Sequence, residues 1–318
     1  MLKTMPAILK KHIVIPGLFL LFSVSPAAQM YPSLIDDYEL PAPDIAHFDG
    51  QVEAIRILRV TNDAQPVPVL AMEFSRSGKP LSHTTYGDGR FRWRSEFSYD
   101  ESDRLVQWRG RNVSGDLEWI YEYDYDDQGR RVQVTEQTGS GLLAGVRNMQ
   151  YRNDVLEEQI QYDGAGRVQW SRRFDWRDGG LLRTWTLIFA DGGLVKRVEE
   201  HYSPFGRLVR EEHFDQNDAT TEVLSYAYDR YGRVRQVTTR DDTGAIRRTR
   251  TYQYVDNDYP ERIHRVDMVE NVEVIRSFEY RFDAQGNWTD RTERIVTERD
   301  GERVGEDHNT LQRQIRYY

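Results

Sequence analysis

One short phrase recurs along this chain and constrains its fold more than any other feature: an aromatic residue, Asp, two variable residues, Gly and Arg. Clear copies begin at Tyr125, Tyr162 and Tyr228, and a variant begins at Phe282. Because one turn per strand, alternating between two turn types, is typical of an antiparallel meander, the spacing predicts a long series of hairpins. The turn residues stand 12 to 14 positions apart, near residues 103, 115, 129, 141, 154, 166, 179, 192, 206, 218, 232 and 244.

The residue types of the phrase indicate the turn geometry. Asp at the first position of a type I turn can bond the backbone two residues on, and Gly at the fourth position takes the left-handed conformation of a bulge. This geometry places Asp229 beside Arg233 and Tyr228 opposite Val234. We assign turn-forming roles to Asp126, Gly129, Arg130, Asp163, Gly166, Arg167, Asp229, Gly232, Arg233, Asp283 and Gly286.

Between the turns, apolar and polar residues alternate with a period of two, as in half-buried strands. Trp119, Tyr121 and Tyr123 share one face of such a strand, whereas Glu122 and Asp124 share the other. No comparable helical periodicity follows the N-terminal segment, so the predicted fold is all-β, with roughly 18–20 strands. Flat, that sheet would be about 90 Å wide. Open sheets of more than about ten strands usually curl, split or close, so we expect a barrel, spiral or shell, or two layers.

The N-terminal segment has the features of a secretory signal peptide. Lys3, Lys10 and Lys11 precede an apolar run from Ile13 to Val24, which is too short to span a bilayer comfortably. Small residues follow at 25–28, so the sequence predicts a signal peptide over 1–28 and an exported protein, periplasmic or secreted. Residues 29–49 then form a predicted extended arm that covers a sheet edge or plugs an opening, and 50–318 form the repeat domain.

The phrase resembles the YD repeat of the RHS family, in which tandem copies build long β-sheets that coil into hollow shells. The C-terminal stretches 280–291 and 310–318 resemble the closing hairpin of short exported RHS-repeat-like bacterial proteins. The resemblance implies a fold and a compartment. It implies no toxin activity, because the chain has neither the proline-rich core segment nor the C-terminal toxin domain of the large RHS toxins.

Residues suited to catalysis or metal binding are few. With 0 Cys, the chain has no disulfide and no thiolate nucleophile, and its net charge of -9 disfavours nucleic acid as a partner. His201 and His213 lie in similar contexts but about 13 Å apart in the predicted hairpin, too far to share a metal. Asp124 and Asp126 partly match a calcium loop, although a solvated turn fits them better. We therefore predict no enzyme activity, no metal site and no cofactor.

Two functions from different classes fit this sequence. The first is an exported, non-catalytic binding or scaffold module of the bacterial envelope, whose aromatic residues stack on a glycan or polymer. The alternative is an immunity-type or partner protein that binds a secreted toxin or envelope protein through its acidic, arginine-rich face. Neither reading requires a membrane span after signal cleavage, and the sequence does not identify the binding residues.

Overall fold

The structure is a computed structural model that describes residues 48–61, 65–254 and 259–318. In these residues twenty strands follow one another, interrupted by one short 3-10 helix, η1 (Asp178–Gly180). The strands are β1 (Val52–Val60), β2 (Val67–Phe74), β3 (Pro80–Gly87), β4 (Arg90–Tyr99), β5 (Leu105–Arg111), β6 (Leu117–Tyr125), β7 (Arg131–Thr138), β8 (Leu143–Arg152), β9 (Val155–Asp163), β10 (Val168–Arg177), β11 (Leu182–Phe189), β12 (Leu194–Tyr202), β13 (Leu208–Phe214), β14 (Thr220–Tyr228), β15 (Val234–Asp241), β16 (Ile246–Tyr254), β17 (Pro260–Asp267), β18 (Val272–Phe282), β19 (Trp288–Arg299) and β20 (Glu302–Tyr317).

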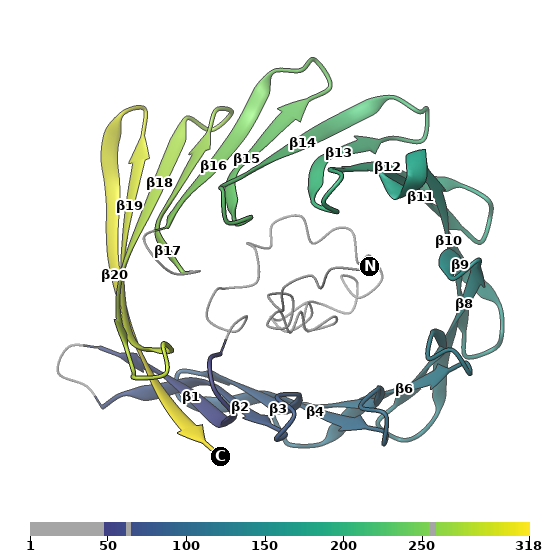
Figure 1. The fold of residues 1–318 in the computed structure, drawn as a ribbon, viewed down its shortest axis with the longest axis horizontal. Helices are drawn as coiled ribbons and strands as arrows, with labels where there is room; N and C mark the ends of the chain where they lie inside the picture. The colour runs from purple at the N-terminus through teal and green to yellow at the C-terminus, as the bar shows by residue number, and fades with distance from the viewer. Residues whose placement is uncertain (1–47, 62–64, 255–258) are drawn as a thin grey trace, which may run out of the picture.

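The sheet closes on itself. Each strand pairs antiparallel with the next in the chain, and β20 returns to pair with β1, where Ile315 lies opposite Ile55. The strands form a continuous ring in Figure 1. The all-β meander is confirmed, and of the shapes expected for so wide a sheet, the chain adopts the closed barrel. The predicted signal peptide, and the predicted arm except its last two residues, lie outside the described residues.

The aromatic face of the sheet is the inner face of the barrel. The described chain approaches β1 from inside the ring (Figure 1), and Phe48 at its start packs edge-on against Phe74, with 5.4 Å between ring centroids. The guanidinium of Arg313 lies 5.2 Å from the Phe48 ring. Residues that lie opposite each other on paired strands point to the same face of the sheet. The inner side can therefore be followed from Phe74 and Arg313 through the strand pairs around the whole barrel.

The outer face is polar and paired. On that face Thr, Gln, Ser and charged residues surround aliphatic side chains such as Ile120, Ile160 and Ile275, and oppositely charged side chains meet across neighbouring strands. A barrel that spans lipid instead carries an apolar band on its outward face. The outer face of this barrel carries charged residues on most of its strands. Outer ion pairs at 2.6–3.3 Å join Arg94 to Glu96, Arg111 to Glu96, Arg173 to Glu158, Arg210 to Glu212 and Arg294 to Glu306.

The turns built on the repeated phrase share one hydrogen-bond pattern. In the first clear copy, the Asp126 N–H donates to the Arg130 carbonyl, and the Gly129 N–H donates to the Asp126 carbonyl, both at 2.9 Å. One oxygen of the Asp126 carboxylate accepts the backbone N–H of Gln128 and of Arg130, while the other accepts Arg130 Nε at 2.7 Å. Gly129 has a φ of 78°, which a residue with a Cβ rarely adopts. Turn chemistry thus fixes where each strand ends.

A tyrosine at or near the end of β4, β6, β8, β14, β16 and β18 ties one hairpin to the one before it. The Tyr125 hydroxyl donates to the Leu105 carbonyl at 2.8 Å, and the Tyr254 hydroxyl to the Val234 carbonyl at 3.1 Å. The Arg of the preceding turn lies over the same ring, as Arg233 does 4.4 Å from the centroid of Tyr254. The Arg of the repeated phrase therefore contacts both the Asp of its own turn and the tyrosine ring of the next repeat. The same hydroxyl-to-carbonyl bond occurs at Tyr99, Tyr151, Tyr228 and Tyr280.

Apolar packing is concentrated in two parts of the inner face. One cluster joins β1, β2 and the start of β19, where Trp288 and Met72 are almost completely buried. The second joins β10, β11 and β12 around Val198, which is fully buried. None of the helical structure in the described residues is long and apolar enough to cross a membrane.

Candidate functional site

The predicted turn residues lie at the rims of the barrel and do not meet at one site. The turns of Asp126, Asp229 and Asp283 follow β6, β14 and β18, which all run in one direction. The turn of Asp163 follows β9, so it lies at the opposite rim. Its carboxylate accepts the backbone N–H of Arg167, the contact that contributes most to a pKa of Asp163 below its usual value. In each copy, Asp and Gly form the turn locally.

The two histidines compared in the sequence face opposite sides of the sheet. His213 lies opposite Val198 on the inner face and is buried, whereas His201 lies opposite Arg210 on the outer face. A bulge between His201 and Tyr202 shifts the register of this strand pair. Throughout the described part of the chain, no three His, Asp or Glu side chains are grouped as a metal site would require.

The inner face of β4, β5 and β6 carries a continuous group of aromatic rings, here called the aromatic wall: Trp93, Phe97, Trp108, Trp119 and Tyr121. Trp108 and Trp119 meet edge to face with centroids 4.7 Å apart, and Trp108 stacks on Phe97 at 5.9 Å. Gly110 makes room for them, because a Cβ there would lie 2.3 Å from the Trp119 ring. All five rings are half-buried, so part of each remains available for contact.

Beside the aromatic wall lie three inner arginines, here called the arginine strip: Arg131 on β7, Arg147 on β8 and Arg172 on β10. Each guanidinium lies over an aromatic ring, at 4.6 Å from Tyr123, 5.0 Å from Trp170 and 4.7 Å from Trp185 respectively. Nε of Arg131 and of Arg172 is shielded from solvent without a hydrogen-bond partner. No carboxylate in the described chain forms an ion pair with any of the three.

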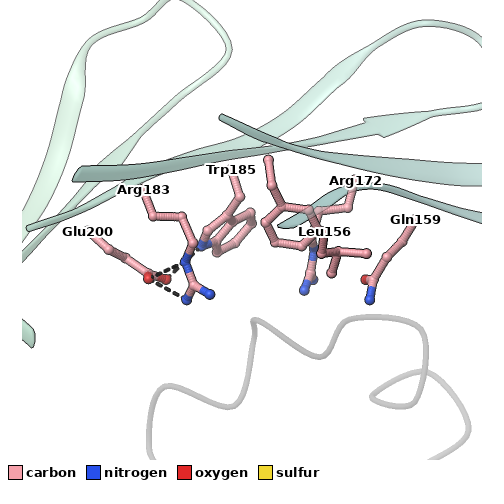
Figure 2. Close-up of a pocket in the computed structure, with 7 residues that line it drawn as sticks. Leu156, Gln159, Arg172, Arg183, Trp185 and Glu200 are labelled. Atoms are coloured by element: carbon pink, nitrogen blue, oxygen red, sulfur yellow. Dashed lines mark hydrogen bonds and ion pairs between the residues drawn. The ribbon is translucent and has the colours of Figure 1, made fainter. Parts of the chain in front are cut away.

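A hollow of about 340 Å³ opens on the inner face next to the arginine strip. Figure 2 shows its side chains projecting from the same face of β9 to β12, with Arg172 and Gln159 on one side and Arg183 and Glu200 on the other. Arg183 Nε donates to Glu200 at 2.6 Å, and the same carboxylate accepts Trp185 Nε1 at 2.9 Å. Arg183 thus has a carboxylate in direct contact, whereas Arg172 forms no ion pair in the described chain and is affected by Glu200 only at longer range.

The inner arginines were missed by the sequence reasoning, although a signal for them exists. In β10, the alternation of Trp170 and Phe174 already places Arg172 on the same face as the rings. Arg147 carries a similar signal, since its strand partner Gln161 lies in register with Trp170. Strict assignment of charge to the outer face hid this pattern.

Comparisons with known proteins find no relative that identifies the chain. No family model matches it, and no curated protein matches its sequence. Among solved structures, a porin-like protein from Bacteroides uniformis has a TM-score of 0.34 and 12% identity, over 85% of this chain and 98% of that one. TcdB2-TccC3 without its hypervariable C-terminal region has a TM-score of 0.19 and 10% identity, over 76% of this chain and 19% of that one. Because both scores are this low, the chain is characterised by its own geometry: a closed, repeat-built all-β barrel with an aromatic and arginine-bearing interior.

Proposed function

We propose that this chain is an exported, non-catalytic binding protein of the cell envelope, and that the interior of its barrel binds a glycan or a similar polymer. The observation that carries the proposal is the aromatic wall. Flat, half-exposed rings on one concave face give large contact area to sugar rings at little cost in conformational entropy. Rings needed only for the core would be fully covered, as Trp288 is.

Export and the absence of catalysis are parts of the same proposal. The N-terminal pattern supports export, and the charged outer face supports a protein that is not embedded in lipid. Catalysis needs several polar groups converging on one point, and the inner polar groups instead follow the strand register. Mass spectrometry should find a mature N-terminus near Ala28 or Gln29. Turnover of an envelope polysaccharide, lost on mutating one carboxylate pair, would contradict the non-catalytic assignment.

The turn motif also supports a relationship to RHS-type repeat proteins. Its Arg links two successive hairpins in this chain, through an ion pair such as Arg130 with Asp126 and through the ring of Tyr151. A sequence selected for tandem hairpins is expected to retain that residue. The proposed relationship concerns architecture, and it carries no toxin activity.

The alternative, a protein that binds a toxin or envelope protein through its outer face, has less support. Outer arginines such as Arg173 and Arg210 already pair with carboxylates of their own wall. A partner would have to replace these pairs to gain from them, and exposed pairs contribute little in either case. Recovery of one specific envelope protein by the purified chain, without any glycan binding, would favour this alternative.

Binding of soluble envelope oligosaccharides, followed by tryptophan fluorescence and calorimetry, tests the proposal. Trp93→Leu removes one ring of the aromatic wall and should weaken binding by about tenfold, the loss of one stacked ring. Tyr231→Leu is the control, since Tyr231 is 64% exposed at a turn and lies far from the aromatic wall in the strand order. Equal affinity for both variants and the parent would count against the aromatic wall as the binding surface.

A further inference from the structure

The arginine strip contains two cations that form no direct ion pair in the described chain, although Glu136 acts on Arg147 and Glu200 on Arg172 from a longer distance. Arg147 Nε donates to the side-chain oxygen of Gln161 at 3.0 Å, a neutral acceptor, and its guanidinium lies over Trp170. Arg172 lies over Trp185, and its Nε is shielded from solvent without a hydrogen-bond partner in the described chain. Both side chains are half-buried on the inner face. A charge that is removed from water normally has a partner of opposite charge. We therefore expect an anion from outside the chain to bind these two arginines.

The electrostatics of the strip agree with this geometry. Burial lowers the pKa of Arg172 to about 10, with the neighbouring charges of Arg147 and Arg183 acting in the same direction and the carboxylate of Glu200 in the opposite one. Burial likewise lowers the pKa of Arg147. At neutral pH both groups keep their charge at a cost in free energy, and that cost falls when an anion binds beside them.

The surroundings of the two cations suit a carboxylate on a sugar. A guanidinium presents several N–H donors in a plane, and it can hold a carboxylate with two parallel hydrogen bonds. Gln159 offers a further amide beside Arg172 across the strand pair, at the edge of the hollow. The aromatic wall follows on β4 to β6, so one extended chain along the inner face could meet rings and cations in turn.

We infer that the polymer bound in the barrel is an acidic polysaccharide, whose anionic groups are held by Arg147 and Arg172 while its sugar rings stack on the aromatic wall. The inference rests on the proposed function and names the chemical class of its ligand. Nucleic acid, the other common polyanion, is disfavoured because the net charge is -9 and the hollow itself contains Glu200.

A matched pair of ligands isolates the charge. Oligogalacturonate carries a carboxylate on each sugar, and its fully methyl-esterified form has the same backbone without charge. With the full chain, calorimetry at low salt should give at least about tenfold tighter binding to the acid form, the gain from one charge-assisted contact. Dextran sulfate, with neutral dextran as its reference, tests whether sulfate groups serve in place of carboxylates.

Arg172→Gln should remove most of the preference for the acid form, and Arg147→Gln should reduce it. Arg173→Gln is the control, since Arg173 is the next residue, points outward and pairs with Glu158. Near-ultraviolet circular dichroism checks that each variant keeps its fold. Rescue of the preference by Arg172→Lys would separate the charge from the packing over Trp185.

The outcomes separate the two proposals. Equal affinity for the acid and ester forms, or an unchanged preference in Arg172→Gln, overturns the inference and leaves glycan binding in place. Binding to neither oligosaccharide, nor to any other glycan, overturns the proposed function and this inference with it. Tighter binding to a single-stranded DNA oligonucleotide than to oligogalacturonate and dextran sulfate would also overturn the inference.

Discussion

Arginine side chains have different surroundings in two parts of the inner face. On β16 to β19, two inner arginines are matched by carboxylates: Arg248 Nη2 lies 3.2 Å from Asp267, and Arg276 Nε lies 3.0 Å from Glu293. On β8 and β10, Arg147 and Arg172 have no carboxylate partner in the described chain. The repeat therefore permits internal neutralisation. Where such a pair is absent beside the hollow, at Arg147 and Arg172, an external anion is expected.

The difference has opposite consequences for stability. A half-buried ion pair holds the fold together mainly because removing one partner leaves the other uncompensated. An unmatched buried cation already bears that cost, so its removal relieves the fold. Mutations in the two regions should consequently change stability in opposite directions.

The largest effect is expected in the matched region. Glu293 is 6% exposed, and Glu293→Gln removes the carboxylate that Arg276 Nε contacts at 3.0 Å. We expect a loss of about 3 kcal/mol in the free energy of unfolding, measured by urea denaturation. Glu158→Gln, which breaks the outer pair with Arg173, should cost at most about 1 kcal/mol. Equal losses would remove the distinction between inner and outer pairs.

Next in size is a change in the aromatic wall. The Cβ of Gly110→Ala would lie 2.3 Å from the Trp119 ring and 2.4 Å from the Trp93 ring, so the rings must move. We expect about 2 kcal/mol of destabilisation and an altered near-ultraviolet spectrum. In Gly305→Ala, the new Cβ would have its nearest neighbour at 3.9 Å, and the fold should gain about 0.5 kcal/mol. A stable Gly110→Ala variant with an unchanged spectrum would show that the rings are less tightly packed than described.

In the unmatched region, removing a charge should stabilise the protein. Arg172→Met keeps a flexible apolar side chain against Trp185 and eliminates the uncompensated cation. We expect unfolding to require about 1 kcal/mol more, together with weaker binding of oligogalacturonate. If the variant is instead less stable, the cation contributes more through its contact with Trp185 than its burial costs.

The smallest expected change in stability comes from His83. It is a third kind of inner residue, a buried base that stays neutral. It is 2% exposed, and burial lowers its pKa from 6.5 to about 4. As the pH falls below 6.5, His83 becomes protonated in the unfolded chain but stays neutral in the folded chain. The folded state therefore loses stability on acidification. Between pH 7 and pH 6 we expect a loss of about 0.7 kcal/mol, absent in His83→Gln. Identical pH profiles for the two proteins would contradict a neutral, buried His83.

Local features of the fold could be predicted from the sequence because local chemistry determines them. The Asp and Gly of the repeated phrase predict turns, and the alternation in stretches such as residues 119–123 predicts strands with one aromatic face. Closure could not be predicted, since it depends on pairing Ile55 with Ile315, and no local pattern specifies which strand meets the first. A spiral and a barrel contain the same hairpins.

The inner site was harder to predict because the inner face carries both aromatic rings and arginine side chains. Period-two alternation separates faces, but it does not say which face a given arginine will share with aromatic rings. Arg172 and Arg173 are adjacent in sequence, yet one lies over Trp185 and the other pairs with Glu158 on the outside. The tyrosine bonds between hairpins were also missed, although Tyr99, Tyr125 and Tyr151 recur every 26 residues.

The most direct test is whether an acidic glycan enters the barrel. Because the chain has no cysteine, Gln159→Cys places a single thiol at the inner hollow, and Arg173→Cys places one on the outer face. The rate of thiol alkylation is measured with and without oligogalacturonate. The account predicts that the ligand slows labelling at position 159 and leaves position 173 unchanged. Unchanged labelling at position 159 under saturating ligand, or protection only at position 173, would contradict binding inside the barrel.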